Sequence, residues 1–171
     1  MYEYSFGSIE EKGSIRASRT VQQWMRSYAR KPGDWYIVKM DIAKFFFRIP
    51  VDVQLRELSK PLDDPDMVWF LEQAIRCDGR PLGLPVYCTD VTTAERISGI
   101  GMQVGSLISQ MTANVVMTPT DYYIKRELRV PEHARFMDDM MCIVDGKKAA
   151  WEVVGLSLIH ISEPTRPEPI S

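Results

Sequence analysis

The chain of 171 residues has few cysteines, no long apolar run and almost no net charge. Its three cysteines (Cys77, Cys88 and Cys142) are odd in number and show no paired spacing, which excludes a disulfide framework or a zinc site. We therefore expect reduced, buried thiols in a cytoplasmic protein. No apolar stretch approaches the roughly 18 residues of a membrane span, and no secretory signal opens the chain, so we expect no membrane partner.

The net charge of −2 conceals an uneven distribution. Residues 10–50 hold nine Lys and Arg against four Asp and Glu, whereas residues 51–100 hold five against nine. A polyanionic partner would therefore contact the first stretch. Charge alone does not indicate nucleic acid, because the chain is not basic as a whole, and a solvated helix face explains the same residues.

Hydrophobic periodicity and chain breakers predict helices that alternate with a few strands. In the first half we expect a helix capped by Ser14 and reaching about Arg30, a strand over 35–41, and helices over about 50–58 and 65–76, with Asp64 capping the second. Residues 77–100 should be mainly loop, with room for one short strand. In the second half we expect a helix from about Ser106, a second helix from Thr118 to Leu128, a hairpin over 135–144 and a helix from Lys147. Pro119 should separate the two helices near residue 118, since proline breaks a helix interior.

The amino-acid pattern of the chain changes at Leu156. The string LSLIHISEPTR over 156–166 resembles the conceptual translation of a sequencing-library adapter, and it interrupts the helical pattern that begins at Lys147. We expect residues 156–171 to be a non-native tail without function. A genuine Pro-rich linker is the alternative.

Three separated segments carry residues suited to chemistry. DIAKFF begins at Asp41, where the predicted strand ends. GMQVGSLISQ begins at Gly101 and opens a helix. FMDD begins at Phe136, at the predicted hairpin tip. Each segment alone is a weak signal, because an Asp pair in a turn is usually solvated and an aromatic run is usually core. Their order and structural contexts together are specific.

The three segments resemble motifs A, B and C of reverse transcriptases, and the resemblance to bacterial members covers roughly residues 4–155, including the opening SFGSIEEKGSIRASRTVQQWM. It implies an α+β polymerase palm, an antiparallel sheet with helices packed on one face, plus part of the fingers. Residues 1–34 would be a fingers remnant and the helix before the palm, 35–50 and 100–155 the palm, and 51–99 the fingers segment between motifs A and B.

The resemblance implies RNA-directed DNA polymerisation from dNTPs on an RNA template with a DNA or RNA primer. Asp41, Asp138 and Asp139 would hold two Mg²⁺ ions, with Mn²⁺ as a possible substitute. Two divalent ions can hold the attacking and leaving oxygens of an in-line displacement, and Mg²⁺ prefers carboxylate oxygens. Three clustered carboxylates without a cation would repel one another, which also favours a metal.

Further roles follow from the same motifs. Phe46 matches the aromatic residue that disfavours a 2′-hydroxyl, although ordinary packing explains it too. Val104 and Gly105 match the loop against the incoming nucleotide, and Gln110 the end of motif B. A stripe of arginines could follow template phosphates: Arg16, Arg19, Arg26 and Arg30. For Lys39 and Lys44, phosphate contact and simple solvation both stay open.

The sequence departs from the pattern in motif C, where Phe136 replaces the usual Tyr, and in motif B, where Gln103 and Ser106 replace Pro and Asn. We expect upstream fingers and a downstream thumb to lie outside residues 1–155, so that the 171-residue chain alone is inactive. The end of motif B favours retron, diversity-generating or abortive-infection types, which can require a structured RNA or accessory protein. Two alternatives remain: a catalytically silent palm that binds nucleic acid or acts in phage defence, and an RNA-dependent RNA polymerase or nucleotide cyclase.

Overall fold

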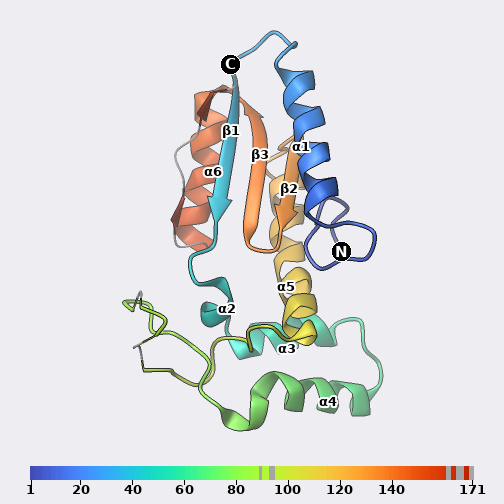
Figure 1. Cartoon of the computed structure of the whole chain (residues 1–171), viewed down its shortest axis with the longest axis vertical. Helices are drawn as coiled ribbons and strands as arrows, with labels where there is room; N and C mark the ends of the chain where they lie inside the picture. Colours follow the sequence, from blue (N-terminus) through green and yellow to red (C-terminus); the bar gives the residue numbers. More distant parts are fainter. Residues whose placement is uncertain (89, 93–94, 161–162, 165–167, 170–171) are drawn as a thin grey trace. The chain divides into compact units, whose positions relative to one another are not determined.

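The computed structural model describes residues 1–88, 90–92, 95–160, 163–164 and 168–169. Its chain divides into two compact units, residues 1–43 with 118–171 and residues 44–117. The elements, labelled in Figure 1, are α1 (Ser14–Tyr28), β1 (Trp35–Asp41), α2 (Phe45–Arg48), α3 (Val51–Ser59), α4 (Pro65–Arg76), the 3-10 turn η1 (Cys77–Gly79), α5 (Leu107–Arg126), β2 (Glu132–Phe136), β3 (Asp139–Asp145), α6 (Gly146–His160), β4 (Glu163–Pro164) and β5 (Glu168–Pro169). The predicted α+β class is confirmed.

The first unit is built on an antiparallel sheet in the order β2-β3-β1-β4, with β5 also paired to β1. Successive side chains of a strand point to opposite faces, and the register shows which residues share a face. Val38 lies opposite Cys142 and Met40 opposite Met140, and all four are buried. The alternate positions, which include Lys39, lie on the other and more exposed face.

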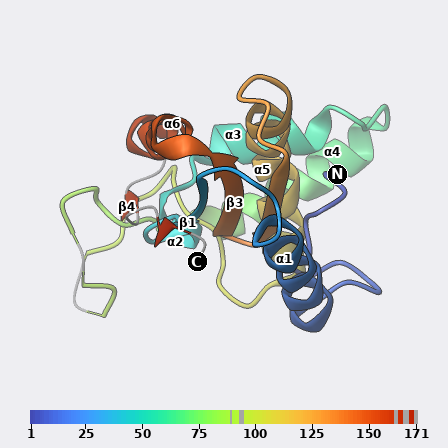
Figure 2. The same cartoon turned by 90° about the horizontal axis from the view of Figure 1, so that it is seen from above.

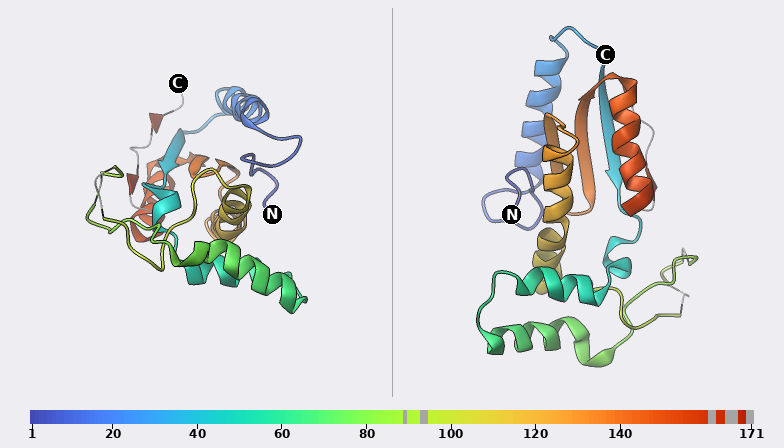
Figure 3. Two further views of the ribbon diagram at one scale, coloured as in Figure 1. Left: turned by 60° about the horizontal axis from the view of Figure 1, so that its bottom comes forward. Right: turned by 180° about the vertical axis from the view of Figure 1, so that it is seen from behind.

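Helices cover the buried face of this sheet. α6 packs against β1 and β3, and the C-terminal half of α5 reaches β2 through the side chain of Asp121. Figures 2 and 3 show α5 and α6 together on one side of the strands, as the palm interpretation predicted. α1 lies on the opposite side, where the Tyr28 ring meets Trp35 edge-on and its hydroxyl donates to Glu132.

The second unit, residues 44–117, has a small core of its own. Buried members of this core are Phe45, Ile49, Val51, Ile75, Leu84 and Met102. The buried Gln54 amide donates to the carbonyls of Ile49 and Gly101, which joins α3 to the loop before α5. Asp64 caps α4 by accepting from the backbone N–H of Asp66 at 2.9 Å, as predicted. α2 was not predicted.

Three predictions about local structure were wrong. Pro119 lies inside one continuous helix, α5, because the contacts of the buried residues Asp121 and Ile124 outweigh the roughly 3 kcal/mol that an interior proline costs. Ser14 is the first residue of α1 and not its cap, and the cap is Gly13 with a φ of 89°. All three cysteines are free, as expected, but only Cys142 is buried.

Residues 156–160 continue α6, and β4 and β5 pair with β1. The prediction of a non-native tail stays untested, and for residues 161–162, 165–167 and 170–171 it lies outside the described residues. Among the helices that the structure describes, none combines the length and apolarity needed to cross a membrane.

Candidate active site

The three predicted aspartates lie at one end of the β1–β3 pair. Asp41 ends β1 and Asp139 begins β3. Continuing the register one step beyond the pair Met40 and Met140 sets Asp41 opposite Asp139 on the same face. Directly opposed Cβ atoms in an antiparallel pair are about 4.5–5.5 Å apart. The first unit alone therefore brings motifs A and C together.

Asp138 belongs to the tight turn that closes the β2–β3 hairpin. Phe136 and Asp139 are the last pair of that hairpin, so Met137 and Asp138 form the turn between them. Met137 has a φ of 58°, in the left-handed region that non-glycine residues seldom adopt. Such residues recur at functional sites and persist only where the surroundings hold them.

The carboxylates of this cluster interact electrostatically. Partial burial raises the pKa of Asp138, and the neighbouring charges of Asp41 and Asp139 raise it further, against backbone hydrogen bonds that lower it. Each of these charges disfavours ionisation of Asp138, as expected for like charges that share a small region. Asp138 therefore lies close enough to Asp41 and Asp139 for their charges to act on it.

Lys39 is the nearby cation, with its Nζ 3.5 Å from Oδ1 of Asp139 and both side chains more than half exposed. Among the residues that the structure describes, no three acidic, His or Cys side chains are arranged as a ready metal cluster. The three side chains still suit a hard cation, because all are carboxylates and they lie at the end of β1, in the hairpin turn and at the start of β3. Asp41 and Asp139 are exposed, so their oxygens can turn toward Asp138 without repacking the core.

The predicted nucleotide-contacting residues lie in the second unit. The carbonyl of Phe46 accepts from the backbone N–H of Met102 at 2.6 Å, so Phe46 and the motif B loop adjoin. In that loop Val104 is 63% exposed, and Gly105 has a φ of 87° with open space where a Cβ would stand. Gln110 is half-buried in the first turn of α5.

The predicted arginine stripe follows α1 and its C-terminal end. Arg16, Arg19, Arg26 and Arg30 are all exposed. The last three line one open groove with Gln22, Gln23, Ser27 and Lys31. Because α1 covers the sheet on the side opposite α5 and α6, this basic surface shares its side of the sheet with Asp41 and Asp139.

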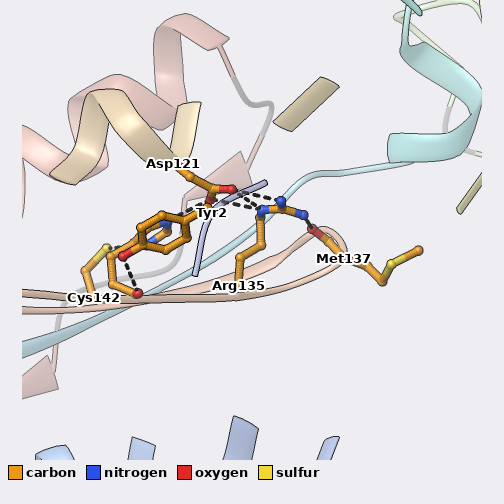
Figure 4. Close-up of polar contacts among 6 residues, drawn as sticks. Tyr2, Asp121, Arg135, Met137 and Cys142 are labelled. Atoms are coloured by element: carbon orange, nitrogen blue, oxygen red, sulfur yellow. Dashed lines mark hydrogen bonds and ion pairs between the residues drawn. The ribbon is translucent and has the colours of Figure 1, made fainter. Parts of the chain in front are cut away.

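A buried polar network behind the aspartates was missed by the sequence interpretation (Figure 4). Arg135 donates from Nε and Nη2 to both oxygens of Asp121, at 2.8–3.0 Å. His133 contacts the same carboxylate through Nε2 at 2.9 Å. All three side chains are at most 1% exposed. The one signal in the sequence is an arginine at a core-facing position of a strand, next to Phe136.

The same network contains Cys142, His133 and Asp121 in the order of a cysteine nucleophile, its base and an orienting acid. The Cys142 Sγ lies 3.4 Å from His133 Nδ1. A carboxylate accepts hydrogen bonds, so Nε2 of His133 is the donor to Asp121, and in a neutral ring that leaves Nδ1 to accept from the thiol. Burial raises the pKa of Cys142, and the Asp121 charge raises it further, so the thiol stays protonated. This arrangement is structural and not nucleophilic.

An antiparallel sheet with α5 and α6 on one face, α1 on the other and acidic residues at the hairpin tip is typical of a palm-type α+β protein. The family model described as reverse transcriptase (RNA-dependent DNA polymerase) matches residues 6–161, which is most of the chain. The chain therefore belongs to the reverse transcriptase family. No curated protein shows significant similarity to it.

Proposed function

We propose that this chain carries the palm of an RNA-directed DNA polymerase that adds dNTPs to a primer 3′-hydroxyl. The observation that carries the proposal is the β1–β3 register, which sets Asp41 opposite Asp139 with Asp138 in the adjoining turn. Family membership supports the same reaction and favours it over RNA-dependent RNA polymerisation or nucleotide cyclisation. Three retained acidic residues also argue against a catalytically silent palm.

The aspartates Asp41, Asp138 and Asp139 would hold two Mg²⁺ ions, or Mn²⁺ in their place. Bound divalent ions supply charge neutralisation and orientation of the attacking and leaving oxygens in phosphoryl transfer. The chain itself contributes position: the strand end and the hairpin tip are held by the β1–β3 ladder. Placement of reacting groups accounts for much of catalysis when the protein forms no covalent bond.

The exposed arginines of α1 would bind template phosphates of the RNA. They lie on the same side of the sheet as the acidic site, and three of them line one groove. Binding through phosphates weakens as salt rises, with a slope set by the number of contacts. Replacing Arg19 or Arg26 with Gln should therefore weaken binding for all sequences and reduce the salt slope.

Residues of the second unit would select the incoming nucleotide. Phe46 would exclude a 2′-hydroxyl, and the loop with Val104 and Gly105 would lie against the nucleotide and the templating base. The open space around Gly105 supports such an approach. Gln110 would orient the helix or the template. Replacing Phe46 with Ala should relax the preference for dNTPs over NTPs.

The test is incorporation of dNTPs on a primed RNA template with Mg²⁺ or Mn²⁺. It should be run on the 171-residue chain, for which we expect no activity, and on a longer protein in which the chain is joined to fingers and thumb segments of its family. In the longer protein, Asp138→Asn should abolish incorporation and Asp63→Asn, at an exposed loop position, should not. Incorporation that survives Asp138→Asn rejects the catalytic assignment. Reading the genomic locus that encodes the chain would identify the retroelement type, any dedicated RNA and the status of residues 156–171.

A further inference from the structure

We propose that Arg135, oriented by Asp121, is a positioning residue that holds the turn presenting Asp138. The inference rests on the proposed metal-binding role of that turn. Arg135 uses two of its nitrogens on Asp121 and donates from the third, Nη1, to the carbonyl of Met137 at 3.0 Å (Figure 4). That carbonyl belongs to the peptide bond between Met137 and Asp138. The guanidinium is therefore hydrogen-bonded to the backbone directly before a candidate catalytic residue.

The geometry makes this contact rigid. A guanidinium is planar, and its bidentate pair with a carboxylate sets its orientation as well as its distance. Asp121 and Arg135 are at most 1% exposed, so water does not compete for these bonds. The third donor of Arg135 therefore points in a direction that α5 determines. The left-handed Met137 backbone is the strained point that this donor holds.

The N-terminal segment closes the turn from another direction. A Cβ added at Gly7 would lie 2.7 Å from the backbone nitrogen of Met137, so these two backbones are in direct contact. Phe6 donates its N–H to the carbonyl of Arg135, and Arg135 donates its own N–H to the carbonyl of Tyr4. The turn thus lies between the Arg135 guanidinium and the backbone of the N-terminal segment.

Two variants separate positioning from folding. Arg135→Lys keeps the charge beside Asp121 but loses the planar fork that also reaches Met137. The double variant Asp121→Asn with Arg135→Met removes the buried ion pair altogether and leaves an amide oxygen for His133. Replacing a whole buried pair is tolerated better than removing one partner. Cys142→Ala is the matched control, because it alters the same network at the end remote from the turn.

The first measurement is backbone amide hydrogen exchange in metal-free protein. Both Arg135 variants should speed exchange at Met137–Asp139 by at least about tenfold relative to the centre of the β1–β3 ladder, since the turn opens locally. Cys142→Ala should change the exchange rates of the turn and of the ladder by the same factor. If the turn exchanges as in the wild type in both Arg135 variants, the positioning role is rejected, whatever the metal data show.

The second measurement is Mn²⁺ affinity by isothermal titration calorimetry. Loss of a residue that orients metal ligands lowers affinity about 10–100-fold, which we expect for both Arg135 variants and not for Cys142→Ala. Equal loss in all three variants would mean general destabilisation and would overturn the inference. Wild-type protein that binds no Mn²⁺ would overturn the proposed function instead, and hydrogen exchange would then decide the inference alone.

Discussion

The two faces of one sheet hold carboxylates in opposite circumstances. On the covered face, Asp121 is completely buried and receives hydrogen bonds from both Arg135 and His133. The opposite face is more exposed near its end, and we call it the open face. There Asp41, Asp138 and Asp139 lie close together, and Lys39 Nζ lies 3.5 Å from Asp139. The buried carboxylate is fully hydrogen-bonded, whereas the three carboxylates that water and ligands can reach are not neutralised by neighbouring cations to the same extent.

This difference separates a structural acid from a candidate ligand set. A buried charge without partners costs several kcal/mol, so Asp121 had to acquire a full set of donors. Partly exposed acids can remain under-neutralised at a smaller cost. Burial raises the pKa of Asp138, and the charges of Asp41 and Asp139 add to that rise. Perturbed acids in such a setting are candidates for function. The triad-like order of Cys142, His133 and Asp121 lies on the satisfied face, which is why it has no reactive thiol.

The largest loss of stability should follow from removing Asp121, the hydrogen-bonded carboxylate on the covered face. Asp121→Ala removes the acceptor of Nε and Nη2 of Arg135 and of Nε2 of His133, and loss of one partner of a buried pair costs about 3–5 kcal/mol. We expect urea unfolding to show that loss in the free energy of unfolding. Asp63→Ala, at an exposed position, should change it by less than about 0.5 kcal/mol. Similar losses for the two variants would contradict the comparison.

A second test adds a divalent cation, which would bind the carboxylates of the open face. At about one hundred times its dissociation constant, a ligand stabilises the folded state by about 2.7 kcal/mol. Saturating Mn²⁺ should therefore raise the Tm of the wild type by several degrees. Asp138→Asn should remove that response and leave the metal-free protein no less stable, because it relieves like-charge repulsion. A metal response that persists in this variant would place the ion elsewhere.

The sequence predicted locally encoded elements better than the contacts on the covered face of the sheet. β1, the hairpin and the cap of α4 followed from alternation, turn residues and Asp64, because those signals are local. The Asp121–Arg135 pair joins residues 14 positions apart on a helix and a strand, and only the packing of α5 on β2 brings them together. Pro119 misled for the same reason: the local rule was sound, but tertiary contacts outweighed it.

Gly7 offers a smaller test at the junction of the two faces. Gly7→Ala would bring a methyl group to within 2.7 Å of the Met137 backbone, so the turn must shift. Overpacking of this kind costs about 1–3 kcal/mol in thermal or urea unfolding. Gly155→Ala is the matched control, since open space surrounds that position in α6 and alanine favours a helix by about 1 kcal/mol. If Gly7→Ala is stabilised as Gly155→Ala is, the prediction of a clash with the Met137 backbone is wrong.

The smallest effect concerns Lys39, whose Nζ lies 3.5 Å from Oδ1 of Asp139. Exposed ion pairs contribute about 0–1 kcal/mol, so Lys39→Met should scarcely alter the unfolding of metal-free protein. Metal affinity is the sharper measurement. Under the proposed function a divalent ion would compete with Lys39 for Asp139. Removing the lysine should therefore tighten Mn²⁺ binding a few-fold at low salt and less at high salt, where screening already weakens the pair. Lys147→Met, at an exposed position of α6, should leave the affinity unchanged. Weaker binding in Lys39→Met would show that the lysine supports the ligand geometry and does not stand in for the ion.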